Sequence, residues 1–223
     1  MFVPVDKVLR LRPIAQHWLA TIFVLLMLLT ASAARAADDS ARQQLQACLK
    51  KADRLPDIAR ADAEAWLKRG GGDAALLCRA TAAFHSGEFA KSAADFTRLA
   101  ETRSDAKRAA LLHAQAGLAW MRAKDYNKSE DEYGKALALE SQNPEFWVDR
   151  ATERGAAQRY WDAIDDLNAA LKIMPDMPEA LRLRGDVWFK LGLGNKAEED
   201  FRRVAEIEAE DDVAKTRPQN RKK

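Results

Sequence analysis

The residues of this chain that could do chemistry are few, and their spacing does not suit it. The histidines are His17, His85 and His113, and the cysteines are Cys48 and Cys78. Cys78 and His85 are seven residues apart, so on one helix they share a face but lie about 10 Å apart along its axis. That separation is too long for a nucleophile to hydrogen-bond its base.

No other motif predicts a catalytic or metal site. The spacings H-E-x-x-H and C-x-x-C are absent, so we expect no metal and no cofactor. The glycines at 70–72 have no Lys-Ser or Lys-Thr after them, so they are expected to end a helix rather than hold a phosphate. Neighbours on a helix point about 100° apart, so adjacent acids are expected on solvated faces. These pairs are Asp165-Asp166, Glu198-Glu199 and Asp211-Asp212. A non-enzyme is expected, with a hidden hydrolase site as the alternative.

The elements that carry these residues follow a period of 34 residues. Blocks begin at Ala110, Pro144 and Pro178, and four columns stay in phase between them. Such a phase predicts antiparallel helix pairs that approach at small residues, while bulky residues fill the space beside those contacts. A column here is the set of residues at the same position of each block. Three columns hold small residues (Gly117, Ala151, Gly185; Ser129, Ala163, Ala197; and Ala136, Ala170, Val204), and one holds bulky residues (Tyr133, Leu167, Phe201).

This pattern resembles the tetratricopeptide repeat (TPR) family. The resemblance implies an all-α fold, a right-handed superhelix or α-solenoid of antiparallel helix hairpins. It also implies a non-catalytic scaffold whose concave groove holds a peptide or helix of another protein. Fold alone does not establish function, so the partner's identity stays open.

A weaker copy of the repeat precedes these blocks. It begins at Asp73 when Gly87-Glu88-Phe89 is aligned with Lys124-Asp125-Tyr126. The step from Asp73 to Ala110 is 37 residues, so we expect three extra loop residues within Thr102–Ala109. Further upstream, helices are predicted over Ala41–Arg54 and Pro56–Arg69. The expected units are a signal peptide (1–36), an N-terminal hairpin (37–72), four repeats (73–109, 110–143, 144–177 and 178–211) and a disordered basic tail (212–223).

The first residues have the pattern of a signal peptide. Basic Lys7, Arg10 and Arg12 precede the apolar run Trp18–Leu29, and Ala34-Arg35-Ala36 fits the A-x-A cleavage rule. We therefore expect cleavage near Ala36 and an exported protein, periplasmic or secreted. The alternative is an uncleaved anchor, which would make the protein a membrane-tethered assembly factor for envelope or cytochrome maturation.

Charge argues against a nucleic-acid partner. The chain has 36 basic and 34 acidic residues, but some of the basic ones lie in the signal peptide and in the tail. The remaining body is mildly acidic, which does not suit binding to nucleic acid. The tail could contact phosphates or lipid headgroups, or it could be only solubilising. Its basic residues are Lys215, Arg217, Arg221, Lys222 and Lys223.

The two cysteines of the mature chain are expected to form a disulfide. Cys48 and Cys78 fall in the first helices of successive hairpins, which should pack side by side. In an oxidising compartment an even cysteine count favours pairing. The alternative is a pair of buried thiols.

The family resemblance also predicts which side chains line the groove. In this family the first helix of each hairpin faces the groove, at its second, fifth, ninth and twelfth places. The alternative is that a neighbouring element covers Leu77, Phe84, Leu111 and Leu118 and makes them core. The predicted groove residues are Leu77, Thr81, Phe84, Leu111, Ala114, Leu118, Met121, Val148, Thr152, Arg182, Asp186 and Phe189, with Glu145 and Glu179 at two further places.

One known binding mode of the family is not expected here. TPR domains that grip a C-terminal carboxylate use Lys, Asn and Arg side chains at matching places. In this chain those places lack the cation cluster and include Glu145, Asp149 and Glu179. Because acids there would repel a carboxylate, we expect no receptor of that kind.

Overall fold

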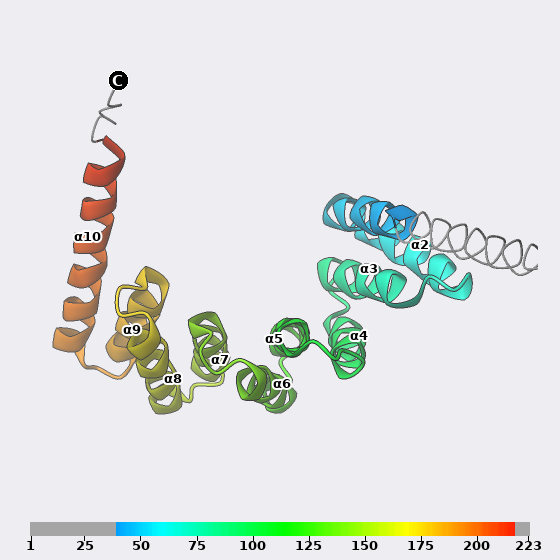
Figure 1. Cartoon of the computed structure of the whole chain (residues 1–223). Coiled ribbons are helices and arrows are strands. Elements are labelled where there is room, and N and C mark those ends of the chain that lie inside the picture. Colours follow the sequence, from blue (N-terminus) through cyan, green and yellow to red (C-terminus); the bar gives the residue numbers. More distant parts are fainter. Residues whose placement is uncertain (1–38, 217–223) are drawn as a thin grey trace, which may run out of the picture.

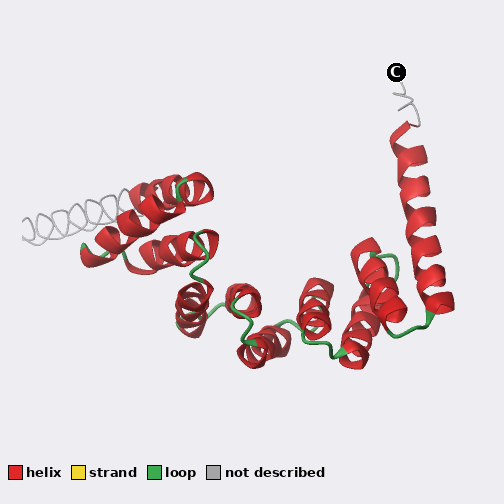
Figure 2. Ribbon diagram, turned by 180° about the vertical axis from the view of Figure 1, so that it is seen from behind, coloured by secondary structure: helices red, strands yellow, loops and turns green. Residues whose placement is uncertain are grey.

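We describe residues 39–216 of the protein from a computed structural model, with side chains through residue 213. Within that range every regular element is a helix, and short loops join the helices (Figure 2). Residues 39–54 form the first helical segment. The others are α2 (Pro56–Lys68), α3 (Gly72–His85), α4 (Phe89–Glu101), α5 (Ala106–Arg122), α6 (Tyr126–Leu139), α7 (Pro144–Ala156), α8 (Tyr160–Ile173), α9 (Pro178–Lys190) and α10 (Gly194–Thr216).

The helices stack as hairpins into an open arc (Figure 1). Each helix from α2 to α10 packs on the next one along the chain, and α5, α7 and α9 also contact one another in order. The helices α3, α5, α7 and α9 lie on the inside of the arc, while α4, α6 and α8 lie on its outside. This confirms the all-α solenoid predicted from the 34-residue period.

The turn within each hairpin is the same in all four repeats. One residue in each turn has a left-handed backbone, with φ of 80° at Gly87, 63° at Lys124, 63° at Gln158 and 76° at Gly192. In each case the next amide bonds back to a carbonyl in the last helical turn at 2.8–3.0 Å, as from Asp125 N to Trp120 O. This is the Schellman ending of a helix. The shared geometry supports the alignment used to place the weak first repeat.

The columns of small residues allow close helix approach, as predicted. A Cβ added to Gly117 would lie 2.9 Å from the ring of Tyr133, and one added to Gly185 would lie 2.6 Å from the ring of Phe201. Ser129 Oγ donates to the carbonyl oxygen of Gly117 at 2.8 Å. Each hairpin therefore closes with a bulky side chain of its second helix lying against a small residue of its first.

The extra residues of the first step lie in a helix and not in a loop, contrary to expectation. The loops between repeats span 102–105, 140–143 and 174–177, which are equal in length. Instead α5 has 17 residues where α7 and α9 have 13. It begins at Ala106, where the side chain of Asp105 accepts a hydrogen bond from the amide of Arg108. This cap starts the helix about one turn early.

The N-terminal hairpin is joined covalently to the first repeat. Cys48 and Cys78 form a disulfide with a Cα–Cα distance of 6.0 Å, as predicted. Around it the buried residues are small, namely Ala52, Ala59, Ala63 and Ala82. The core between α7 and α10 is built from larger side chains, including Ile164, Leu167, Leu171, Leu181 and Trp188.

The last helix is longer than the sequence suggested. It continues from Gly194 to Thr216. The disordered tail was predicted to begin at residue 212, and this start was placed too early. On this helix, the last among the described residues, Phe201 is 40% exposed although the same position is buried in the earlier repeats. The predicted signal peptide, its cleavage site near Ala36 and residues 217–223 lie outside the described residues. Among the described helices, none has the length and apolar content to cross a membrane.

Candidate functional site

The helices α3, α5, α7 and α9 lie on the inner side of the arc (Figure 1), and each carries a row of half-buried or exposed side chains. We call this row the inner-face stripe. On α3 it is half-buried, and from α5 to α9 it is mostly exposed. Its half-buried members are Leu77, Thr81, Phe84, Leu118 and Met121, and its exposed members are Leu111, Gln115, Glu145, Asp149, Thr152, Glu179, Arg182, Asp186 and Phe189.

Two residues predicted for this surface belong to the core instead. Ala114 is 5% exposed and Val148 is 3% exposed, each packed within a hydrophobic cluster, so their assignment to a contact surface was wrong. The next residue along each helix, Gln115 or Asp149, is exposed in its place. One residue further turns a helix by about 100°, which exchanges a core position for a surface one. The other predicted positions stay predictions.

The first half of the inner-face stripe is apolar. Leu111 is 47% exposed, and Leu118 and Met121 lie further along the same helix, α5. At the adjoining edge, the rings of Phe84 and Phe89 meet edge to face with centroids 5.3 Å apart. The guanidinium of Arg122 lies over both rings, at 5.8 and 5.1 Å from their centroids. This cation is therefore engaged by aromatic side chains.

Carboxylates predominate in the second half of the stripe, which also carries Arg182 and the exposed Phe189. Glu145 and Asp149 lie on α7 and Glu179 on α9. The pKa of Asp149 is raised to about 6, because the surrounding protein reduces the hydration of its charge and because Glu179 and Glu145 repel that charge. Among the described residues, no basic side chain forms an ion pair with any of these three carboxylates.

Between the two helices of each hairpin lies a buried charged pair, which the sequence interpretation missed. Arg79 bonds Asp95 through two hydrogen bonds of 2.8 and 2.7 Å. The same two-pronged contact joins Arg150 to Asp166 and Arg184 to Asp200. Asp166 is 2% exposed, so its expected place on a solvated face was wrong. The signal was present: an arginine recurs in phase, with an aspartate 16 residues after it.

The second repeat replaces this pair with a different one. Its arginine position holds Ala116, and its aspartate position holds Glu132. Nδ1 of His113 lies 2.7 Å from Oε2 of Glu132, and Lys135 Nζ donates to Oε1 of the same carboxylate at 2.7 Å. Burial alone would raise the pKa of Glu132, but these hydrogen bonds outweigh it and lower the pKa. The His113–Glu132 pair thus takes the place of the arginine–aspartate pair of the other repeats, which indicates a structural role.

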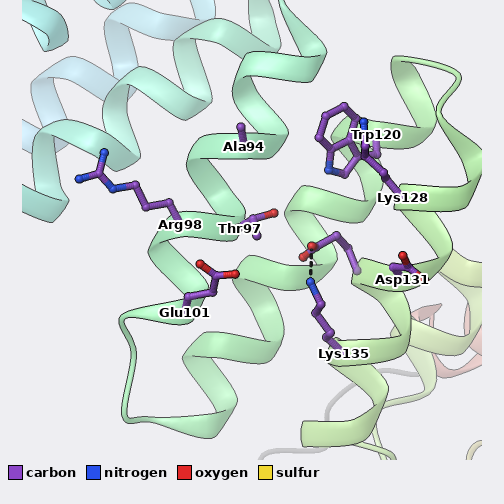
Figure 3. Close-up of a pocket in the computed structure, with 9 residues that line it drawn as sticks. Ala94, Thr97, Arg98, Glu101, Trp120, Lys128, Asp131 and Lys135 are labelled. Carbon is purple, nitrogen blue, oxygen red and sulfur yellow. Dashed lines mark hydrogen bonds and ion pairs between the residues drawn. The ribbon is translucent and has the colours of Figure 1, made fainter.

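A pocket of about 410 Å³ lies between α4, α5 and α6 (Figure 3). Its lining mixes Arg98, Lys128 and Lys135 with acidic side chains, Thr97 and Trp120. The ammonium of Lys128 lies 4.2 Å from the centre of the Trp120 ring, and Lys135 is paired with Glu132. Arg98, Glu101 and Asp131 of the wall form no ion pair with a described residue, so the lining carries unpaired charges of both signs and favours neither an anion nor a cation.

The described residues hold no group of three or more His, Cys, Asp or Glu side chains that could bind a metal ion. The sulfurs of Cys48 and Cys78 are joined, so neither can act as a nucleophile. His85 lies 3.4 Å from Asp53, and both are substantially exposed. What the arrangement offers chemically is a long contact surface, apolar toward α5 and acidic toward α7 and α9.

Sequence comparison relates the chain to TPR proteins. No protein-family model matches it. Over 111 residues it is 32% identical to small glutamine-rich tetratricopeptide repeat-containing protein 2 of Mycosarcoma maydis, covering 50% of this chain and 31% of that protein. Over 104 residues it is 28% identical to heat shock protein STI1 of Saccharomyces cerevisiae, covering 46% of this chain and 18% of that protein. The chain thus spans less than a third of the length of these relatives.

Structural comparison relates the fold to MamA. The structure matches the MamA RS-1 ArsTM double mutant with a TM-score of 0.65 and 15% identity, over 78% of this chain and 96% of that one. The match to MamA 41-end from Desulfovibrio magneticus RS-1 has a TM-score of 0.63 and 16% identity, over 77% and 95%. The two sequence relatives support a TPR protein, and these structural matches show a TPR-like helical solenoid fold.

Proposed function

We propose that this chain is a non-catalytic scaffold that binds a segment of another protein on the concave side of its arc. The observation that carries the proposal is the inner-face stripe, which runs over the first helices of four successive hairpins and is mostly exposed from α5 to α9. A stacked array creates an extended curved surface of this kind, and such surfaces serve as binding sites in repeat proteins. The exposed apolar residues Leu111 and Phe189, at 47% and 73% exposure, support a protein partner.

The groups that could do chemistry have structural roles, which supports a scaffold over an enzyme. Cys48 and Cys78 join two hairpins, and His113 and Glu132 fill the column that holds an arginine–aspartate pair elsewhere. A purified protein that hydrolysed a generic ester or phosphoester, and lost that activity in His113→Gln, would overturn this part of the proposal.

We further propose that the protein is exported, with cleavage near Ala36 and action in the periplasm or outside the cell. The basic and apolar segments before Ala36 and the disulfide are both features of exported proteins. If Trp18–Leu29 is retained, the protein is instead a membrane-tethered assembly factor in the envelope. N-terminal sequencing separates the two: a chain starting at Ala37 supports cleavage, and recovery of uncut chain with membranes supports the tether.

Photo-crosslinking from single positions tests the binding surface. A benzoylphenylalanine is placed at Gln115 or Thr152 on the inner-face stripe, or at Asp165 or Lys172 on the outer helix α8 as matched controls; all four are exposed. We expect discrete crosslinked partners in the cell from the inner positions only. Equal crosslinking from the outer positions, or none from the inner ones, would contradict the proposal.

A further inference from the structure

The carboxylates of the inner-face stripe are exposed, and unlike the buried acids of the hairpins they have no ion-pair partner among the described residues. Asp95, Asp166 and Asp200 are each held by an arginine of the same hairpin. Glu130 pairs with both Arg154 and Arg159, and Glu153 pairs with Arg159. By contrast, within the described part of the chain, no ion pair involves the inner-face acids Glu145, Asp149, Glu179 and Asp186. The inner face thus carries negative charge that the fold itself does not neutralise.

Two arginines of the inner helices α5 and α9 are already engaged elsewhere. Arg182, on the same helix as Glu179 and Asp186, pairs with Glu208 of α10. Arg122 lies over the rings of Phe84 and Phe89. Neither guanidinium is therefore available to neutralise the acids of α7 and α9. A ligand that supplied positive charge would relieve the mutual repulsion of these carboxylates.

An apolar surface adjoins the acids along the direction of the array. The next inner helix, α5, packs against α7 and presents Leu111, with Leu118 and Met121 half-buried beside it. Neighbouring helices are about 10 Å apart, so the path from α5 across α7 to α9 is roughly 20 Å. A helical segment of about 13 residues or an extended one of about 6 spans that distance.

We propose that the inner face binds a segment of another protein in which a cluster of apolar residues lies next to a run of lysines or arginines. This rests on the proposed scaffold function and specifies the partner's chemistry. The apolar cluster contacts α5, and the basic run lies over the acids of α7 and α9. Charge complementarity selects this occupant: an acidic segment would meet the unpaired carboxylates, and so would the inner face of a second copy.

Fluorescence anisotropy with two peptide probes tests the inference on protein purified after expression of the full chain. The basic probe is a peptide of about 16 residues with leucines in one half and lysines in the other; the acidic probe has glutamates in place of the lysines. We expect the basic probe to bind at physiological salt and the acidic probe to bind at least about tenfold more weakly. Equal binding of the two probes would overturn the charge assignment while leaving the scaffold function intact.

A matched pair of variants separates specific docking from general attraction. Glu145→Gln/Asp149→Asn/Glu179→Gln removes three charges from the inner face, and Asp165→Asn/Glu198→Gln/Glu199→Gln removes three from exposed positions outside it. We expect the first variant to lose about tenfold or more in affinity and the second to stay within about twofold. Equal losses would overturn the inference. Thermal unfolding by circular dichroism verifies that both variants are folded, which is expected because none of the six side chains is in an ion pair.

Other occupants give different outcomes. Tighter probe binding after deletion of residues 217–223 would assign the inner face to the chain's own basic tail. A dimer that dissociates in the inner-face variant, seen by light scattering, would assign it to a second copy. Either result would overturn the inference. Native partners that crosslink to Gln115 or Thr152, but remain bound in the inner-face variant, would refute the basic segment while supporting the scaffold function.

Discussion

The two ends of the array are held together in different ways. The buried cluster around the disulfide that joins the N-terminal hairpin to α3 consists of alanines, and Trp66 is a large buried side chain of α2. At the other end, α7–α10 bury large aliphatic and aromatic side chains and add the buried pairs Arg150–Asp166 and Arg184–Asp200. Because alanine buries little apolar area, the hairpin gains less from the hydrophobic effect. The comparison indicates that a covalent link replaces packing energy where the core is thin.

Truncating the large-side-chain core should have the greatest effect. Leu167 is fully buried between the helices of the third repeat. We expect Leu167→Ala to lower the free energy of unfolding by about 3–4 kcal/mol, through lost burial and the cavity left behind. Urea unfolding followed by circular dichroism measures this. Leu139→Ala, at a side chain that is 42% exposed, is the control and should cost less than about 0.5 kcal/mol. Similar losses in both variants would refute the account of the core.

Removing the disulfide should destabilise the N-terminal hairpin selectively. The bridged cysteines are separated by 30 residues, so the loop-entropy model predicts a loss of up to about 3.6 kcal/mol. We expect Cys48→Ala/Cys78→Ala to raise amide hydrogen exchange over residues 39–68 and to leave α7–α10 unchanged. Reduced wild-type protein is the matched control and should behave in the same way. Unchanged exchange in the hairpin would show that its alanine core suffices without the link.

Gly117 and Gly185 hold the same position in two repeats, one inside the array and one in the last described hairpin, so alanine substitutions at them compare how tightly the two hairpins are packed. An alanine at Gly117 would press on Tyr133, which is 1% exposed and cannot move, whereas one at Gly185 would press on Phe201, which is 40% exposed. We expect Gly117→Ala to cost about 2 kcal/mol and Gly185→Ala about 1 kcal/mol or less. Paired urea titrations measure both. A larger cost at Gly185 would show that the last hairpin is as tightly enclosed as the inner ones.

The smallest expected effect concerns the acidic inner face. The pKa of Asp149 is about 6 in the folded chain against an ordinary value of 3.8, so the folded protein holds this proton to higher pH than the unfolded chain. Deprotonation of Asp149 therefore lowers the free energy of unfolding as the pH rises from about 4 to 6. We expect Asp149→Asn to stabilise the protein at pH 7.5 and to be neutral at pH 4. Solvent access to this side chain limits the gain to about 0.5–1 kcal/mol.

The matched control for this effect is Asp165→Asn on the outer face of α8, which should change stability little at either pH. Thermal melts at the two pH values provide the comparison. A gain at Asp149 that is equal at pH 4 and pH 7.5 would assign it to helix propensity rather than to relieved charge repulsion.

Much of the solenoid was predictable because a stacked repeat imposes the same local constraints again and again. The small and bulky columns recur since each hairpin meets the same steric limit, as Gly117 against Tyr133 shows. The partnership of Cys48 and Cys78 followed from their places on the first helices of successive hairpins. A periodic sequence of this kind determines contacts between neighbours in the chain order.

The residues facing the inner side were predicted less well. Positions 114 and 148 were assigned to the surface, but the structure buries Ala114 and Val148 and exposes Gln115 and Asp149. A period of 34 residues determines which helix faces inward, but a rotation of about 100° about the helix axis changes which side chain does so. That rotation depends on how each helix packs on its neighbours.

By itself, then, the sequence determined the repeat, the hairpin turns, the bulky and small contacts and the cysteine pair, since each depends on residues at a constant separation. Only the tertiary structure decided which charges are neutralised. Asp165 and Asp166 are alike in the sequence, yet one is exposed and the other is held by Arg150. Glu145, Asp149 and Glu179 come from two helices that stacking brings together. Their unmatched charge depends on what surrounds each side chain in space, which a periodic pattern does not contain.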